Sequence, residues 1–184
     1  DLALFHTTAQ EGATTLEEYR KRMQPEQKGI YCLTGRSLSA LKASPKLEPF
    51  AAKSLEVLLM TDPVDEVILA EGPEADSIKL LNAGLDSDVP ESGEEKGRRE
   101  EELKGMEADF APLREQAMAA MSDRLQEVRP SLSLTSSPAC LRDANGLSFQ
   151  MEQLMRAMGQ TPPAQKRVLE LNVGHPLIKR LMEL

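Results

Sequence analysis

The chain has 184 residues, enough for one medium domain or two small ones. Its formal net charge is -8, which argues against nucleic acid or an anionic membrane as a partner, because both attract clustered lysine and arginine. Hydrophobic residues make up 40% of the chain, enough for a core, yet no apolar run reaches the roughly 20 residues that span a bilayer.

Residues 1–71 alternate between helical and strand patterns. Thr15 begins a capping-box sequence, and the two apolar runs at 29–34 and 57–60 are typical of short strands, the second buried on both faces. Between them we expect two short helices in 37–53, because Ser-Pro interrupts any continuous helix there. The pattern predicts an α/β fold with a small parallel-sheet βαβ module.

An acidic stretch follows this module. Residues 86–109 hold ten acidic and four basic side chains, a net charge of -6, with almost nothing apolar around several glycines and a proline. Such a composition buries too little surface to offset the entropy of ordering it. We therefore expect an acidic linker at 72–97.

Residues 98–184 predict an α+β module, helix-rich with a small mixed or antiparallel sheet. Pro130 marks its first strand as an edge strand, because proline cannot donate to the ladder. The predicted elements are a long helix at 100–122, strands at 125–134, 139–141 and 168–171, and helices at 147–158 and 176–184.

The chain opens without Met and without a basic stretch ahead of an apolar one. We therefore expect no signal peptide, and a piece cut from a longer protein. Cys32 and Cys140 are the only cysteines and form no CxxC pair, which excludes a disulfide framework and a zinc knuckle. We expect both to be buried small hydrophobes in a reducing cytosol.

No common catalytic motif is present. GxGxxG, the P-loop, HExxH and GxSxG are all absent. His175 precedes a proline at a helix start, where a cap or surface role fits better than catalysis. Asp62, Asp65 and Glu66 could suggest a metal, but acidic residues also favour a helix N-terminus for electrostatic reasons alone. We expect no catalytic residue, cofactor site or metal site in this chain.

The helix expected at 147–158 carries an apolar stripe. Its members fall at helical spacing and are Leu147, Met151, Leu154, Met155 and Met158, while Phe149 lies off the stripe. One interpretation is an ordinary amphipathic helix packed on its own core. The other is an adaptable binding face, since methionine is flexible and polarizable.

Several stretches resemble the HtpG family, the bacterial ninety-kilodalton heat-shock chaperones. TTLEEYRKRM (14–23), KGIYCLTG (28–35) and SLEVLLMTDPVDE (54–66) follow the order and spacing of the end of the family's middle domain. SPACL (137–141), FQMEQLMRAMGQ (149–160) and LELNVGHPLIKRL (169–181) resemble the start of its C-terminal domain. The resemblance covers nearly the whole chain apart from about 67–98. It implies a middle-domain part at 1–71 and a C-terminal part at 98–184.

The resemblance also implies what a longer chaperone would have. The family's ATP pocket lies in an N-terminal domain outside this chain, so we expect no ATP hydrolysis here, although the full-length proteins use ATP and magnesium. The family is a cytoplasmic homodimer that dimerises through its last helices. We expect this chain, which stops at Leu184, to be monomeric or to associate weakly.

In the family, the helix that matches 147–158 is amphipathic and binds unfolded clients. Carried over by position, the contact residues are Leu147, Met151, Leu154 and Met155, with Met158 on the same stripe. A second family client patch matches Glu66 and Val67. There the family commonly has Trp where this chain has Val67, which puts that patch in doubt.

Two further hypotheses compete with a client-binding chaperone fragment that couples its two modules. One is a small nucleotide- or ligand-binding α/β protein with an acidic regulatory segment. It requires a concave pocket at the carboxyl ends of the strands, near Thr34 or Thr61. The other is a purely structural spacer. Full burial of Met151 and Met155 against the chain's own strands would exclude the client interpretation for that helix.

Overall fold

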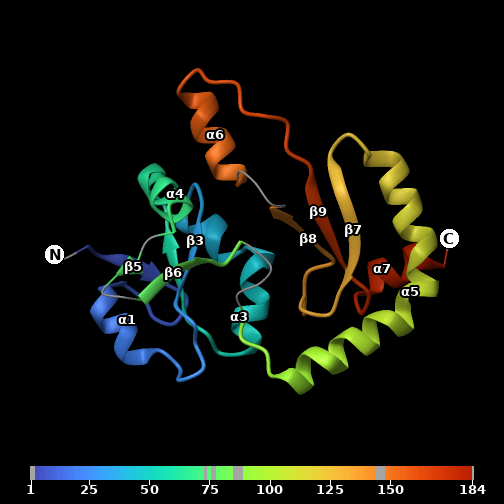
Figure 1. Cartoon of the computed structure of the whole chain (residues 1–184), viewed down its shortest axis with the longest axis horizontal. Coiled ribbons are helices and arrows are strands. Elements are labelled where there is room, and N and C mark those ends of the chain that lie inside the picture. Colours follow the sequence, from blue (N-terminus) through green and yellow to red (C-terminus); the bar gives the residue numbers. More distant parts are fainter. Residues whose placement is uncertain (1–2, 73, 76–77, 85–88, 144–147, 184) are drawn as a thin grey trace. The chain divides into compact units, whose positions relative to one another are not determined.

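The structure, a computed structural model, describes residues 3–72, 74–75, 78–84, 89–143 and 148–183 (Figure 1). Unit 1 comprises Asp1–Pro90 with Leu147–Pro163, and unit 2 comprises Glu91–Gly146 with Ala164–Leu184. Each contains a mixed sheet with helices, so the predicted α/β then α+β fold class is confirmed. Within the described part of the chain, none of the helices combines the length and apolar character needed to cross a bilayer.

The sheet of unit 1 has strand order β2-β1-β4-β3-β6-β5. β3 pairs in parallel with both β4 and β6, which confirms the predicted parallel pair, while β1 runs antiparallel to β4. The strands are β1 (Phe5–Thr7), β2 (Ala13–Thr14), β3 (Ile30–Thr34), β4 (Val57–Met60), β5 (Glu74–Ala75) and β6 (Ile78–Asn82).

The helices of unit 1 begin where the sequence signals indicated. Thr15 Oγ1 accepts a hydrogen bond from Glu18 N–H at 3.2 Å, and the Glu18 carboxylate accepts from Thr15 N–H at 3.1 Å, so the capping box is confirmed. Ser44 and Pro45 interrupt 37–53 as expected. The helices are α1 (Leu16–Arg22), α2 (Leu38–Lys42), the 3-10 turn η1 (Pro45–Leu47), α3 (Glu48–Ala52), α4 (Pro63–Ala70) and α6 (Phe149–Ala157).

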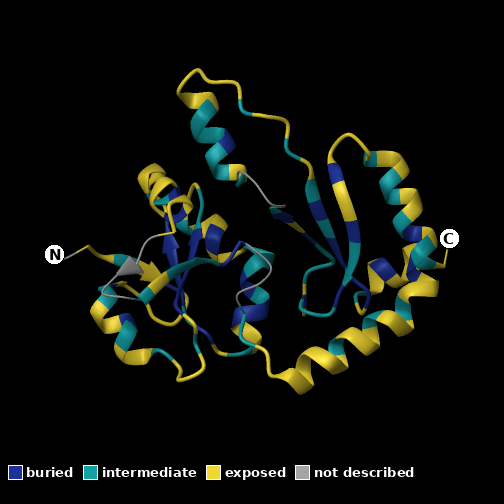
Figure 2. Cartoon of the chain, in the orientation of Figure 1, coloured by how far each residue is buried: buried dark blue, intermediate teal, exposed yellow. Residues whose placement is uncertain are grey.

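The central strands of unit 1 are buried on both faces (Figure 2). Successive side chains of a strand point to opposite faces, so Tyr31 and Leu33 pack with Phe50 on one side. Ile30 and Cys32 pack with Tyr19 on the other side. The continuous apolar run at 57–60 follows from this, because neither face of β4 meets solvent.

The region expected as a linker, 72–97, contains regular structure in its described part. β5 and β6 belong to the sheet of unit 1, and α5 (Gly93–Met121) begins well before residue 98. Ser92 caps α5, since its Oγ accepts from Glu95 N–H at 3.2 Å while the Glu95 carboxylate accepts from Ser92 N–H at 2.9 Å. The acidic composition is that of a solvated helix as well as of a linker, because glutamate, lysine and arginine are good helix formers.

Unit 2 packs one long helix against a three-stranded sheet of order β7-β9-β8. β7 is parallel to β9 and lies at the edge, as Pro130 predicted, and β8 is antiparallel to β9. Phe110 and Leu113 of α5 pack against Val128 and Leu171 in a single core. The remaining elements are β7 (Leu125–Ser131), β8 (Ala139–Asp143), β9 (Arg167–Asn172) and α7 (Pro176–Met182).

Candidate functional site

The methionine-bearing helix forms where the sequence placed it. Ser148 is the N-cap of α6, and its Oγ accepts a hydrogen bond from Met151 N–H at 3.0 Å. At the other end Gly159 adopts a φ of +76°, which glycine tolerates best, and Gln160 N–H returns to the Met155 carbonyl at 2.9 Å. Both ends of α6 are therefore fixed by local sequence.

The apolar stripe of α6 is partly accessible. Met151, Leu154 and Met155 are half-buried, and Met158 is 58% exposed. Leu147 lies outside the described residues. Met151 and Met155 are thus not fully buried, so the condition that would exclude a client-binding face is not met. Phe149, off the stripe, is also 48% exposed.

α6 packs against α4 within unit 1 (Figure 1). This neighbour is unexpected, because the sequence placed 147–158 with the later module. Val67 of α4 is 42% exposed, and Val64 and Ile68 on the same helix are comparably exposed. These three residues recur at helical spacing and form an apolar face on α4.

Glu66 lies at the contact of these two helices and is only 5% exposed. Its carboxylate accepts a hydrogen bond from the Thr34 hydroxyl at the end of β3 and another from the Ser148 hydroxyl at the start of α6. A second polar contact joins Arg36 Nη2 to Gln153 Oε1 at 2.7 Å. The Glu66 carboxylate is therefore buried and held by two neutral hydroxyl donors.

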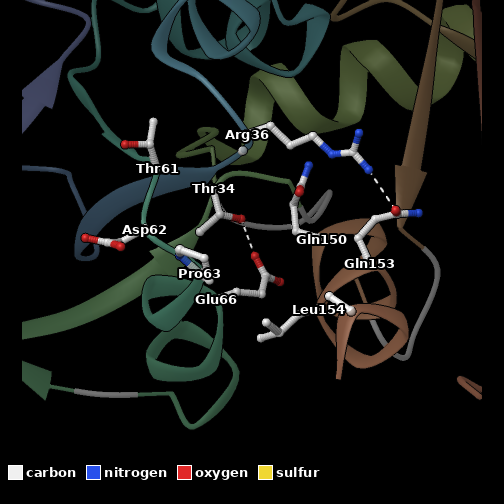
Figure 3. A pocket seen from close by; sticks show the side chains of 11 residues that line it. Thr34, Arg36, Thr61, Asp62, Pro63, Glu66, Gln150, Gln153 and Leu154 are labelled. Atoms are coloured by element: carbon white, nitrogen blue, oxygen red, sulfur yellow. Dashed lines mark hydrogen bonds between the residues drawn. The ribbon is translucent and has the colours of Figure 1, made fainter. Parts of the chain in front are cut away.

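A cavity of about 400 Å³ lies at the carboxyl ends of β3 and β4. We call it the strand-end cavity. In Figure 3, Thr34 turns towards Glu66 and Arg36 turns towards Gln153, while the Thr61 and Asp62 side chains point away from them. Its lining residues are Thr34, Gly35, Arg36, Thr61, Asp62, Pro63, Glu66, Gln150, Gln153, Leu154 and Ala157.

The topology explains why this place is hollow. The chain passes from β3 to β4 in one direction across the sheet, and from β4 back past β3 to β6 in the opposite direction. Loops that leave neighbouring parallel strands in opposite directions open a crevice at their carboxyl ends. The concave pocket required by the ligand-binding hypothesis is therefore present, near the residues the sequence named.

The strand-end cavity is lined by charged side chains of both signs, with Arg36 among them as well as acidic residues. Asp62 lines it at the N-terminus of α4, and Asp65 accepts a hydrogen bond from Asp62 N–H at 3.0 Å. Carboxylates thus occupy the helix end that an anion would use. Burial raises the pKa of Asp65, against the lowering effect of that hydrogen bond.

Other residues singled out for chemistry have structural partners. His175 caps α7, with Nδ1 accepting from Leu177 N–H at 3.2 Å, as expected for a cap. Cys32 and Cys140 are buried thiols, outside any disulfide in the described part of the chain. Among the described residues no group of three or more histidine, cysteine, aspartate or glutamate side chains could hold a metal ion.

The sequence did not reveal the hydrogen bonds that join the end of β3, α4 and α6, which involve Thr34, Arg36, Ser148 and Gln153. Ser148 had a usable signal, because a serine directly before an apolar helical stripe is a typical N-cap. The others carried none, since the Thr34–Glu66 and Arg36–Gln153 hydrogen bonds join residues 32 and 117 positions apart and leave no local pattern.

Comparison with known proteins decides the family. A family model described as "Hsp90 protein" matches residues 1–184. The chain belongs to the Hsp90 family. It is 44% identical over 178 residues to "Chaperone protein HtpG" of Mycobacterium leprae, covering 96% of this chain and 27% of that protein.

Other bacterial members of the Hsp90 family show the same extent of similarity. The chain is 42% identical over 178 residues to the HtpG chaperone of Rhodococcus jostii, which covers 96% of this chain and 28% of the relative. It is also 42% identical over 189 residues to the HtpG chaperone of Geobacter metallireducens, which covers 100% of this chain and 29% of the relative. The resemblance found in the sequence is confirmed, and the chain spans less than a third of the length of these relatives.

Proposed function

We propose that this chain is a client-binding segment of an ATP-driven chaperone and that it couples the middle and C-terminal parts of that protein. The observation that carries the proposal is the stripe of α6, where Met158 is exposed and Met151 and Met155 are half-buried. Its relatives are chaperones by name.

The physical chemistry of the stripe suits non-native clients. Unfolded chains expose varied apolar surface, and burying it yields roughly 25 cal/mol per Å² without requiring a fixed geometry. Methionine adapts to partners of different shape because its side chain is unbranched and polarizable. The apolar face of α4, with Val64, Val67 and Ile68, extends the accessible area.

The remaining parts of the proposal concern the longer protein. Its ATP and magnesium site and its dimerising helices would lie outside this chain, which itself would hydrolyse no ATP and would be monomeric or weakly associating. The longer protein would act as a cytoplasmic homodimer. Its partners would be unfolded or partly folded proteins, with no nucleic acid and no membrane.

The experiment is suppression of aggregation of guanidinium-unfolded citrate synthase by the 184-residue chain. We expect a Met155→Ser and Met158→Ser double variant to need about fivefold or more of the chain for half-suppression, because less apolar surface is buried per client. Leu177→Ser is the matched control, since Leu177 of α7 is also 53% exposed but lies in unit 2. Equal activity of the double variant and the wild type would contradict the assigned face.

The strand-end cavity favours a second candidate function, binding of a small ligand in unit 1. A nucleotide ligand would stabilise the folded chain by mass action. Because carboxylates line the cavity and no glycine-rich phosphate loop is present, we expect magnesium-ATP to leave the thermal unfolding temperature unchanged. A rise in the thermal unfolding temperature of the wild type on adding magnesium-ATP would favour the ligand-binding function, provided that the size of the rise differs in the Asp62→Leu variant.

A further inference from the structure

Neutral hydroxyl groups hold the carboxylate of Glu66 between β3 and α6. Among the hydrogen bonds of the described residues, no other charged side chain is held in this way between these two elements. The Thr34 hydroxyl bonds one of its oxygens and the Ser148 hydroxyl bonds the other. Among the described ion pairs none involves Glu66, although it is 95% buried. A buried carboxylate without a cation depends strongly on each hydrogen bond that remains.

Ser148 performs two tasks with one hydroxyl. Its oxygen accepts from Met151 N–H and so caps α6, while its hydrogen is donated to Glu66. A serine hydroxyl has one donor and two lone pairs, so both bonds can exist together. The start of α6 is therefore tied to the end of β3 through one carboxylate.

A second contact fixes α6 farther along its axis. Arg36, two residues beyond Thr34, donates to Gln153, five residues beyond Ser148. Five residues correspond to about 7.5 Å of helix rise. These two contacts hold α6 at two points along its axis, and Leu154, next to Gln153, lines the strand-end cavity.

We propose that Glu66 is a positioning residue, which acts with Thr34 and Ser148 as a latch that docks α6 onto α4 and the end of β3 within unit 1 and orients its stripe. Glu66 would then affect clients through α6 and not by touching them. The part of this inference that concerns clients rests on the proposed function. The latch itself does not, because docking of α6 can be measured without a client.

The latch is tested by two substitutions at Ser148 that both preserve the helix cap. Asp and Asn are N-caps as good as serine. Ser148→Asp places a second carboxylate against Glu66, whereas Ser148→Asn keeps an oxygen acceptor and supplies N–H donors. The variants thus differ in the latch and match in capping.

The measurement is amide hydrogen exchange of residues 149–157 in the 184-residue chain. We expect Ser148→Asp to speed exchange about tenfold or more, and Ser148→Asn to stay within about threefold of wild type. Exchange in β9 should not change. Adding Glu66→Gln to Ser148→Asp should restore slow exchange, because the glutamine amide can donate to the new carboxylate. Wild-type exchange in Ser148→Asp, or no rescue by Glu66→Gln, would overturn the latch.

A separate readout connects the latch to clients. Binding of fluorescently labelled, reduced α-lactalbumin, a permanently unfolded probe, should weaken severalfold in Ser148→Asp and recover in the Glu66→Gln double variant, because preorganisation of α6 is lost and regained. Unchanged or tighter binding while α6 exchanges faster would overturn the positioning role. The Met155→Ser and Met158→Ser double variant should keep wild-type exchange, so loss of the proposed function and loss of the latch give different results.

Discussion

Cys32 shows how position in the sheet determines the chemistry of a side chain. It lies within β3, pairs with Leu58 of β4 and is fully buried. Burial raises the pKa of its thiol, and the charge of Asp65 adds to the effect. The thiolate is the nucleophilic form of cysteine, so burial in β3 disfavours a nucleophilic role for Cys32.

This pKa shift gives a pH dependence of stability. Above the ordinary thiol pKa of about 8.5 the unfolded chain releases the Cys32 proton while the folded chain retains it, so rising pH favours unfolding. Between about pH 7 and about pH 9.5, wild type should lose about 1.4 kcal/mol more stability than Cys32→Ala. Urea unfolding at both pH values measures the difference, and parallel losses in the two proteins would contradict it.

Glu170 dominates the electrostatics of one element, the central strand β9. It is 3% exposed and accepts from Arg129 Nη2 of β7 at 2.7 Å and from Arg142 Nε of β8 at 3.0 Å. Arg142 is equally buried. Charge-assisted hydrogen bonds thus join both neighbouring strands, β7 and β8, to β9. This arrangement stabilises the order of the three strands.

We expect Glu170→Ala to destabilise unit 2 by about 3–5 kcal/mol, because it leaves the buried Arg142 without its carboxylate. Asp123→Ala is the control within the same unit. Asp123 Oδ2 lies 3.8 Å from Arg124 Nε, and both side chains are exposed to solvent. Loss of this ion pair should change the free energy of unfolding by under about 0.5 kcal/mol. Amide exchange of β9 reports both effects, and similar changes in the two variants would argue against the buried cluster.

Elements with strong local signals could be predicted from the sequence, and the others could not. The capped helix after Thr15 and the doubly buried strand at 57–60 were identified because periodicity and capping are local. β1 and β2 have only three and two residues, too few for a period to show. β6 was not predicted, because its five residues lie next to the acidic stretch, whose composition favoured a linker over a strand.

At the scale of the whole molecule, the sequence could not show that α6 packs against α4 and belongs to unit 1. A stripe at helical spacing indicates that one face is covered, but not by what. The contacts of Glu66 and Arg36 with α6 join segments far apart in the chain, so this half of the candidate site required the structure. Spacing alone predicted the stripe residues, of which Leu147 lies outside the described residues.

The two units have separate cores, which gives a matched pair of expectations. Phe50 of unit 1 is 1% exposed and lies 4.9 Å from the Tyr31 ring, and Phe110 of unit 2 is fully buried. Each change to alanine should cost its own unit about 3–5 kcal/mol. Amide exchange should accelerate in β3 for Phe50→Ala and in β9 for Phe110→Ala. Acceleration of both sheets by either variant would show a single cooperative unit.

The interleaved composition of unit 1 has a consequence for how the chain folds. Thr34 and Glu66 are in place once the sheet forms, but Ser148 is 82 positions beyond Glu66, with most of unit 2 encoded between them. Closing such long loops is slow compared with local pairing. During synthesis the sheet of unit 1 would therefore assemble first with its Glu66 carboxylate open to water, and α6 would be the last element of unit 1 to dock.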